Sequence, residues 1–417
     1  MSKAARAVRA AGGAALVTLL SLATVPATGA GAMAAERVPR VERISVSADG
    51  TQGNGDSLAP SISADGRYVA FASDATNLVP DDTNHLSGVF VKDVRTGRIV
   101  RVTAQSAGAP ADAEAYQPSL SADGRYVAFT SEWSYPVHGG PPGRQSDVYV
   151  RDLRTGRTTK VNIGLDEGFG IVSRDPSISA DGRYVAFVAG ALPWFPASLH
   201  GDVYVYVRDL RTGTTRRASA APGPNGDREA LAPHITPDGS AVAYSTNRPH
   251  VSGANVGYLY AWRRVTGRAE RVDATYDGSE TSPKPSQFAG ISADGRYVLF
   301  NSPWNTMVRG ARHTGGYLRD LVAHRTRTVD APGDPTVDTE AGAFLGTSRE
   351  YVLATDDHEY VRNMRSGHTR SLLPADTGMQ YPVYDGHARV AAFQSFKKDW
   401  VPGDTNGVGD VFLVRLR

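Results

Sequence analysis

Apolar and polar positions alternate in a short block that recurs along the chain. The block reads PSISADGRYVAF at 60–71, PSLSADGRYVAF at 118–129 and PSISADGRYVAF at 176–187. Successive side chains of a strand point to opposite faces, so the second half of the block, with Tyr126 and Val127 on opposite sides, is apolar on both. The pattern predicts short β-strands in a sheet that is covered on both faces.

The block is one part of a longer repeat. Its Asp-Gly pair recurs at Asp65, Asp123, Asp181, Asp238 and Asp294, with gaps of 58, 58, 57 and 56 residues. A fixed period of this size indicates a repeat architecture. A worn copy, GTSREYVLA, stands at 346–354, and YDGHARVAAF stands at 384–393. The chain therefore carries seven copies.

Each copy predicts four strands. A strand opened by Pro meets the Asp-Gly turn and a second strand follows, because Gly supplies the positive φ of a hairpin turn and Asp bonds the turn backbone. A Thr-Gly turn, as at Thr155-Gly156, then joins a third strand to a fourth. Pro is expected at the first position of the innermost strand, where no hydrogen bond need be donated.

Four-stranded units that are apolar on both faces favour a radial arrangement, in which each blade is sandwiched between its neighbours. The last copy ends at 410–417 without a fourth strand, whereas RVERIS at 40–45 resembles the fourth strand RAERVD at 268–273. We therefore predict an all-β, seven-bladed β-propeller of four-stranded antiparallel blades, closed by the N-terminal strand. Six regular blades plus a degenerate one is the alternative.

The N-terminal residues are typical of an exported protein. A basic start, an apolar stretch at 12–25 and the small-residue pattern Ala32-Met33-Ala34 predict a signal peptide at 1–34 and a single propeller domain at 35–417. The apolar stretch is too short for a membrane anchor. We expect a secreted, extracellular or periplasmic protein with no transmembrane segment. The chain has no cysteine, which excludes disulfides and thiolate metal sites.

Charge argues against nucleic acid as a partner. Three of the 45 Lys and Arg precede Ala34, which leaves 42 against 43 Asp and Glu in the rest of the chain. Nucleic acid binding needs clustered cations that displace counterions. We expect no nucleic acid partner, and a monomer.

The motif PSISADGRYVAF followed by DVYVRDLRTG resembles the TolB-type, WD-like β-propeller repeats of exported bacterial proteins. Four aspartates take the place of the aspartate in the WD dipeptide: Asp93, Asp152, Asp209 and Asp320. Arg263 and Asn363 depart from it, so the fourth and sixth blades are expected to close differently. Propellers of this kind include binding scaffolds, transport-associated proteins, peptidase gating domains and some polysaccharide lyases, so the resemblance leaves function open.

Long connections are expected on one face, opposite the tight turns. Large apolar side chains in them predict either a binding platform or local loop cores. The ligand-binding candidates are Trp133, Tyr135, Trp194, Phe195, Trp304 and Trp400.

Three polar groups are further candidates. Asp404, Asn406 and Asp410 alternate around a Gly as in an oxygen-lined calcium loop, with a plain Asx turn as the other interpretation. One histidine per long loop would ring the axis, and solvated histidine is the alternative to a metal site: His85, His138, His200, His250 and His313. Acids in the blade-to-blade connections offer a carboxylate pair: Asp112, Glu114, Asp166, Glu167, Asp338 and Glu340.

Signatures of catalysis are mostly missing. The chain has no G-x-S-x-G elbow, no H-E-x-x-H and no P-loop. We therefore predict a binding or scaffold protein that recognises a protein, peptide or glycan of the cell envelope through its long-loop face. It would need no cofactor, unless the calcium loop is used. A carbohydrate-active enzyme, a polysaccharide lyase or glycosidase with its site at the channel mouth, is the alternative.

Overall fold

The computed structural model describes residues 40–80, 82, 84–103, 113–135, 143–163, 171–191, 203–219, 229–249, 255–277, 286–312, 314–346, 349–356, 358–374 and 379–416. Residues 39–417 form one compact unit. The predicted signal peptide at 1–34 lies outside the described residues. Within them, no helix is long and apolar enough to cross a membrane.

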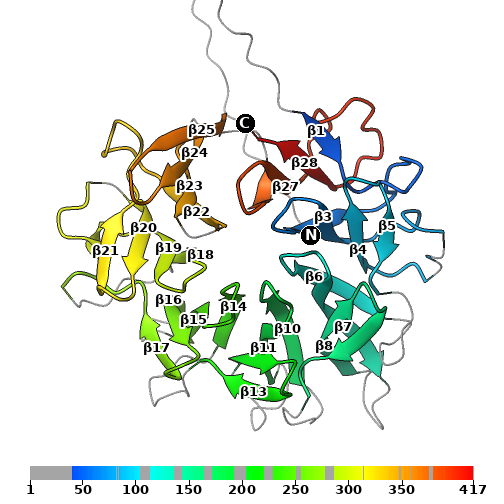
Figure 1. The fold of residues 1–417 in the computed structure, drawn as a ribbon, viewed down its shortest axis with the longest axis horizontal. Coiled ribbons are helices and arrows are strands. Elements are labelled where there is room, and N and C mark those ends of the chain that lie inside the picture. The colour runs from blue at the N-terminus through cyan, green and yellow to red at the C-terminus, as the bar shows by residue number, and fades with distance from the viewer. Residues whose placement is uncertain are drawn as a thin grey trace, which may run out of the picture. The chain divides into compact units, whose positions relative to one another are not determined.

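Seven four-stranded antiparallel sheets form a ring (Figure 1), so the predicted seven-bladed propeller is confirmed. Blade 1 has β2 (Ser57–Ile62), β3 (Tyr68–Ser73), β4 (Gly88–Asp93) and β5 (Ile99–Arg101), and blade 2 has β6 (Glu114–Leu120), β7 (Tyr126–Tyr135), β8 (Gly143–Asp152) and β9 (Arg157–Lys160). Blade 3 has β10 (Ile171–Ile178), β11 (Tyr184–Ala191), β12 (Tyr204–Asp209) and β13 (Thr214–Arg217), and blade 4 has β14 (Glu229–Ile235), β15 (Ala241–Pro249), β16 (Asn255–Arg263) and β17 (Arg268–Arg271).

The remaining blades are built alike. Blade 5 has β18 (Gln287–Ile291), β19 (Tyr297–Ser302), β20 (Gly315–Asp320) and β21 (Arg325–Thr328), with a short 3-10 helix at Asn305–Met307. Blade 6 has β22 (Glu340–Leu345), β23 (Glu350–Ala354), β24 (His358–Asn363) and β25 (Thr369–Pro374). Blade 7 has β26 (Gln380–Tyr384), β27 (Val390–Ser395), β28 (Asp410–Arg415) and β1 (Val41–Arg43). Blade 6 thus has all four strands although its sequence motif is degenerate.

The N-terminal strand closes the ring as predicted. β1 pairs antiparallel with β28, with Val41 opposite Val414 and Arg43 opposite Phe412. The fourth strand of blade 7 therefore comes from the N-terminal end of the propeller sequence, and the other three strands come from its C-terminal end. This pairing covers an edge that would otherwise be exposed.

The innermost strands depart from the prediction. Pro60 does not open β2 but lies inside it, where the register with β3 shifts between Leu58 and Ser61. Ala59, directly before the proline, has a positive φ of 51°. Proline removes a backbone donor, and a bulge is where a strand tolerates that loss. The strand therefore begins three residues earlier than the Pro signal indicated.

Each Asp-Gly turn holds two blades together. In blade 1 the Asp65 carboxylate accepts hydrogen bonds from Ser63 Oγ at 2.6 Å and from the Arg67 amide at 3.0 Å. In blade 2 the turn residue Gly124 has a φ of 70°, and a Cβ there would lie 2.2 Å from the ring of Tyr68 in blade 1. Only glycine permits both the turn and this close approach between blades.

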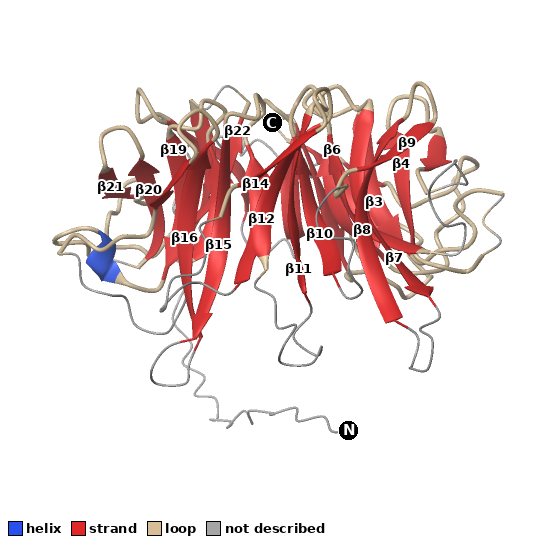
Figure 2. Cartoon of the chain, turned by 90° about the horizontal axis from the view of Figure 1, so that it is seen from below, coloured by secondary structure: helices blue, strands red, loops and turns tan. Residues whose placement is uncertain are grey.

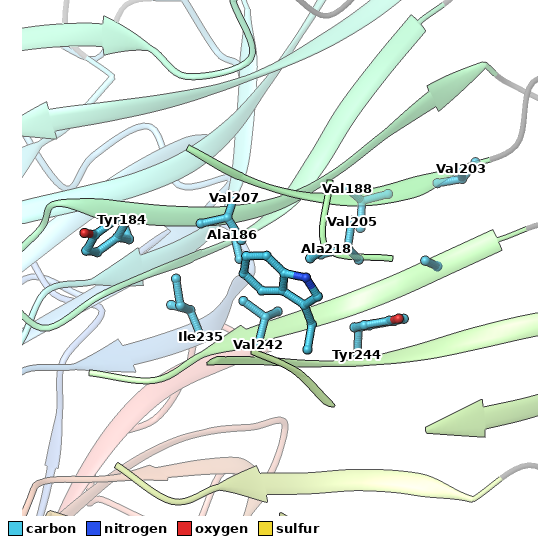
Figure 3. Packing of buried hydrophobic residues seen from close by; sticks show 12 residues of the cluster. Tyr184, Ala186, Val188, Val203, Val205, Val207, Ala218, Ile235, Val242 and Tyr244 are labelled. Atoms are coloured by element: carbon cyan, nitrogen blue, oxygen red, sulfur yellow. The ribbon is translucent and has the colours of Figure 1, made fainter. Parts of the chain in front are cut away.

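The apolar core lies between the blades. The sheets bury Val, Phe and Tyr side chains from neighbouring blades against one another. Figure 3 shows the layer between blades 3 and 4, where Val205 and Val207 of β12 face Val242 and Tyr244 of β15. Figure 2 shows the strands side by side, with the short turns along one face. We call this the tight-turn face, and the opposite end of the strands the long-loop face.

Candidate functional site

A polar pocket opens on the long-loop face where blades 5 and 6 meet. Its volume is about 390 Å³, and it is lined by Gln287, Asn301, Ser302, Pro303, Thr314, Gly315 and Glu340. Glu340 is one of the acids that the sequence singled out. Both its side chain and that of Gln287 are exposed.

Backbone contacts between the two blades fix the walls of this pocket. The Asn301 side chain bonds both groups of the Ala341 backbone, accepting at 2.7 Å and donating at 3.0 Å. Thr314 donates its amide to Asp338 at 2.9 Å. Gly315 has a φ of 107°, and a Cβ on it would overlap the carbonyl oxygen of Thr339. The polar groups therefore stand on a rigid frame, which reduces the ordering cost of binding.

Trp304 lies beside the pocket but packs inward. Its side chain is half-buried against an apolar cluster that includes Phe300, Met307 and Tyr317. The Tyr317 hydroxyl donates to the Trp304 carbonyl at 2.8 Å. Trp304 therefore serves as a core for its own loop, which was the other interpretation of the loop aromatics.

Trp400 is packed in the same way in blade 7. Its ring lies 4.7 Å from that of Phe393 and 6.4 Å from that of Phe412. Its indole nitrogen donates to Ser395 Oγ at 3.1 Å. An indole that is hydrogen-bonded and packed against two tilted rings of its own blade offers little surface to a ligand.

The other aromatic candidates divide into two groups. Trp133 and Tyr135 were expected in a long loop, and this placement is wrong: both belong to β7, where Trp133 is opposite Gln145 and Tyr135 opposite Gly143. Their run alternates β-favouring and polar residues, so the hairpin extends beyond the expected strand. Trp194 and Phe195 lie outside the described residues.

A second polar cluster lies on blade 2. Glu114 of β6 is directly opposite Glu132 of β7, near the long-loop end of the blade. The Tyr116 hydroxyl donates to Glu132 Oε2 at 2.7 Å. Burial and this carboxylate raise the pKa of the Tyr116 phenol, so it stays protonated and keeps donating. Glu114 is one of the acids that the sequence singled out, although it lies in a strand and not in a connection, and Glu132 was not among those acids.

A further polar contact joins the innermost strands of blades 2 and 3. The Asp175 carboxylate accepts from the Gln117 amide, and the Asp175 backbone N–H donates back to Gln117 Oε1 at 3.2 Å. Burial raises the pKa of Asp175 above its ordinary value. The two side chains occupy the same bulge position in adjacent blades, and both residues have a positive φ. Periodicity alone did not mark them, because the bulge was not predicted.

The residues predicted to bind calcium lie together around the guanidinium group of Arg43. Arg43 is 3.0 Å from Asp404 Oδ2 and 3.2 Å from Asp410 Oδ2. Asn406 donates to Asp410 Oδ2 at 3.2 Å, and Ser45 Oγ donates to Asp410 Oδ1 at 2.5 Å. Arg43 and Ser45 belong to the N-terminal segment, so the cluster ties the closing strand to blade 7.

The remaining polar candidates are scattered. His85 is exposed, and the other four histidines of the predicted ring lie outside the described residues, as do Asp112, Asp166 and Glu167. Among the residues that the structure describes, no group of three or more His, Asp and Glu side chains is placed to hold a metal ion. Within the described part of the chain, the structure thus brings together two carboxylate clusters and one polar pocket on the long-loop face.

Neither a protein-family model nor a curated protein sequence matches the chain. Among solved structures, the chain is similar to a structure of prolyl endopeptidases, at 12% identity over 90% of this chain and 51% of the other, with a TM-score of 0.53. It is also similar to the β-propeller domain of the trilobed protease from Pyrococcus furiosus, at 14% identity over 82% of this chain and 89% of the other, with a TM-score of 0.48. TolB from Acinetobacter baumannii is similar at 14% identity over 77% and 55%, with a TM-score of 0.36.

The chain is a seven-bladed β-propeller. It spans about half the length of the TolB chain and of the prolyl endopeptidase chain. Likeness at such identities reports the fold alone, and propellers of one fold serve unrelated functions. The function of this propeller must therefore be argued from its own polar pocket and clusters.

Proposed function

We propose that this propeller is an exported, non-enzymatic binding protein that recognises a protein, peptide or glycan of the cell envelope through its long-loop face. The N-terminal sequence pattern supports export. Sequencing the N-terminus of the secreted protein tests that part. A mature protein that begins after Ala34 would support it, and retention of the full chain in the cytoplasm would refute it.

The polar pocket between blades 5 and 6 is the main support for the binding proposal. Its volume of about 390 Å³ falls within the range of small-ligand sites. Glu340 and Gln287 present a carboxylate and an amide to solvent, while the Asn301 side chain is already bonded to the backbone. This combination suits the hydroxyl and amide groups of a glycan or of a peptide backbone.

An array of cell-envelope glycans and peptides tests this proposal. We expect the wild-type protein to bind a subset of the array, and the Glu340→Gln/Gln287→Ala variant to bind that subset about tenfold more weakly, because hydrogen bonds to a charged group are lost. Arg154→Ala, on the tight-turn face, is the control and should bind normally. Equal binding by all three proteins would refute the pocket as the binding site.

The facing carboxylates of Glu114 and Glu132 favour a second candidate, a carbohydrate-active enzyme. Directly opposite residues in antiparallel strands place their Cβ atoms about 5 Å apart, so their carboxyl groups can approach as closely as the nucleophile and the acid/base residue of a retaining glycosidase do. Tyr116 holds Glu132 in position. Release of reducing ends or unsaturated products from a polysaccharide panel, abolished by Glu132→Gln, would establish this activity and overturn the non-enzymatic proposal.

A further inference from the structure

A wide groove lies on the opposite, tight-turn face, again between blades 5 and 6. Its volume is about 960 Å³. Blade 5 contributes Arg296, Tyr297 and Leu318 to its walls, and blade 6 contributes Arg349, Met364 and Arg365. Arg325 and Arg327 of β21 also line the groove. None of these residues belongs to the long-loop pocket.

The groove lies where the repeat loses an ion pair. In blade 5 Arg296 is 2.7 Å from Asp320, and the same arginine–aspartate pair occurs in blades 1, 2 and 3. The carbonyl of Arg296 accepts the amide that follows Asp320, and the carbonyl of Arg349 accepts the amide of Met364, which follows Asn363. Arg349 is therefore the repeat arginine of blade 6, with a neutral amide in place of its carboxylate.

The groove has an excess of positive charge. Its two lining carboxylates are already engaged: Asp294 accepts bonds from its own turn, and Asp320 holds Arg296, which lowers the pKa of Asp320 to about 2. The side chains of Arg325, Arg349 and Arg365 are exposed and form no ion pair with any residue that the structure describes. Three guanidinium groups thus line one groove without a carboxylate partner of their own among the described residues.

The floor of the groove is apolar. Leu318 is buried there, and Met364 packs against the same cluster between the two blades. Val322, in the turn of blade 5, is 61% exposed beside the groove residues. The face of the Tyr297 ring is covered by the Arg296 guanidinium, 4.9 Å from the ring centre, so it is not free to stack on a sugar. This floor suits aliphatic side chains better than a glycan.

We propose that this groove is a docking site for an acidic peptide segment that also carries aliphatic side chains. Carboxylates of the segment would pair with Arg325, Arg349 and Arg365, since guanidinium groups bind carboxylates through paired, charge-assisted hydrogen bonds. Its aliphatic side chains would cover Leu318 and Met364. The site lies on the face opposite the pocket of the proposed function, so the two proposals stand or fall separately.

Fluorescence anisotropy with a short labelled peptide of alternating Glu and Leu tests the proposal. A peptide of alternating Lys and Leu and a heparin fragment serve as competing probes. We expect the Glu–Leu peptide to bind the full chain, and Arg325→Glu/Arg365→Glu to weaken binding by at least about tenfold. The matched control is Arg154→Glu/Arg157→Glu, which makes the same charge change at the corresponding turn of blade 2. This control should bind the peptide nearly as well as wild type does.

Asn363→Asp is the sharper variant, because it restores the repeat. The Asn363 side-chain oxygen accepts the amides of Arg365 and Ser366, as the Asp93 carboxylate does in blade 1, so the turn should be kept. The new carboxylate would pair with Arg349. We expect an unchanged or higher melting temperature together with about tenfold weaker peptide binding.

Three outcomes would overturn the proposal. The first is absence of binding to the Glu–Leu peptide by a folded wild-type protein. The second is an equal loss of binding in the blade 2 control, which would mean that general charge attraction is responsible. The third is groove-dependent binding of the heparin fragment in place of the peptide, which would assign the groove to an anionic glycan.

Discussion

At the scale of single residues, one ion pair recurs around the ring. In blade 1, Arg67 lies 2.6 Å from Asp93 and its guanidinium lies over the ring of Tyr68. The aspartate also accepts the amides of the turn that follows it. The sequence identified this aspartate through its repeat position and marked Arg263 and Asn363 as departures. It did not reveal that the motif arginine is the partner, because the two residues are 26 positions apart in the chain.

Acid should weaken these pairs. The Arg67 side chain, with help from the turn amides, lowers the pKa of Asp93 from 3.8 to about 2. The stabilising effect of the ion pair is therefore complete above about pH 4 and is lost as the pH falls toward 2. We expect the difference in unfolding free energy between wild type and Asp93→Asn to be constant above pH 4 and to shrink below it. Denaturant unfolding at several pH values measures this, and a difference that grows on acidification would contradict it.

The packed tryptophans lead to a prediction about stability. Because Trp304 contacts Met307 and its neighbours, Trp304→Ala should leave a cavity and cost roughly 1 to 3 kcal/mol of unfolding free energy. Thermal and denaturant unfolding measure the loss. Arg309→Ala, an exposed change in the same connection, is the control. A Trp304→Ala protein that is as stable as wild type but fails to bind its envelope ligand would restore the aromatic platform.

At the scale of elements, the closing strand depends on a buried charge. Arg43 of β1 is almost fully buried, its side chain 7% exposed, and Asp410 of β28 is completely buried. Burial raises the pKa of Asp410, so its charge depends on nearby donors and on Arg43. The sequence predicted β1 from its likeness to a fourth strand. It assigned Asp404 and Asp410 to calcium, because a sequence cannot show that an arginine more than three hundred residues away lies between them.

Removing this arginine should open the ring. Arg43→Ala leaves two buried carboxylates without their cation, and we expect a loss of about 3 kcal/mol or more at pH 7. The loss should be smaller at lower pH, because a carboxyl with a raised pKa gains its proton more readily and the repulsion falls. Arg40→Ala, at an exposed position just before the strand, should change little.

Deletion of 40–47 is the matching test of the whole strand. It exposes the edge of β28, so the truncated protein should aggregate or melt well below wild type in calorimetry and light scattering. A truncated protein that stays monomeric and equally stable would contradict closure by this strand.

Calcium binding remains a prediction for the same cluster. Because Arg43 already supplies positive charge between Asp404 and Asp410, we expect millimolar Ca²⁺ to raise the melting temperature modestly at most. Calorimetry with Ca²⁺ and with EDTA measures this. A large drop in EDTA that Asp404→Ala removes would instead establish a calcium site.

At the scale of the whole molecule, the repeat predicted far more of the fold than of the site. Period, turn residues and strands that are apolar on both faces predicted the blade number, because each blade repeats the same local chemistry. The likeness of residues 40–45 to a fourth strand predicted the closure. The candidate sites lie where residue types depart from the repeat: the connection of Thr314 and Gly315 at the junction of blades 5 and 6, polar Gln117 and Asp175 at the bulge position where blade 1 has Ala59, and Asn363 in blade 6. A single sequence shows that such positions differ, but only the ring places residues of adjacent blades together.

Hydrogen–deuterium exchange would show whether the long-loop face is the ligand-binding surface of the closed propeller. The ligand that binds most tightly in the envelope array would be added to the full chain, and amide protection would be compared with the free protein. We predict protection at the pocket of blades 5 and 6, in peptides that cover Gln287, Asn301–Pro303, Thr314 and Glu340. Protection confined to the Asp-Gly and Thr-Gly turns of the tight-turn face would show that the ligand binds there and not on the long-loop face.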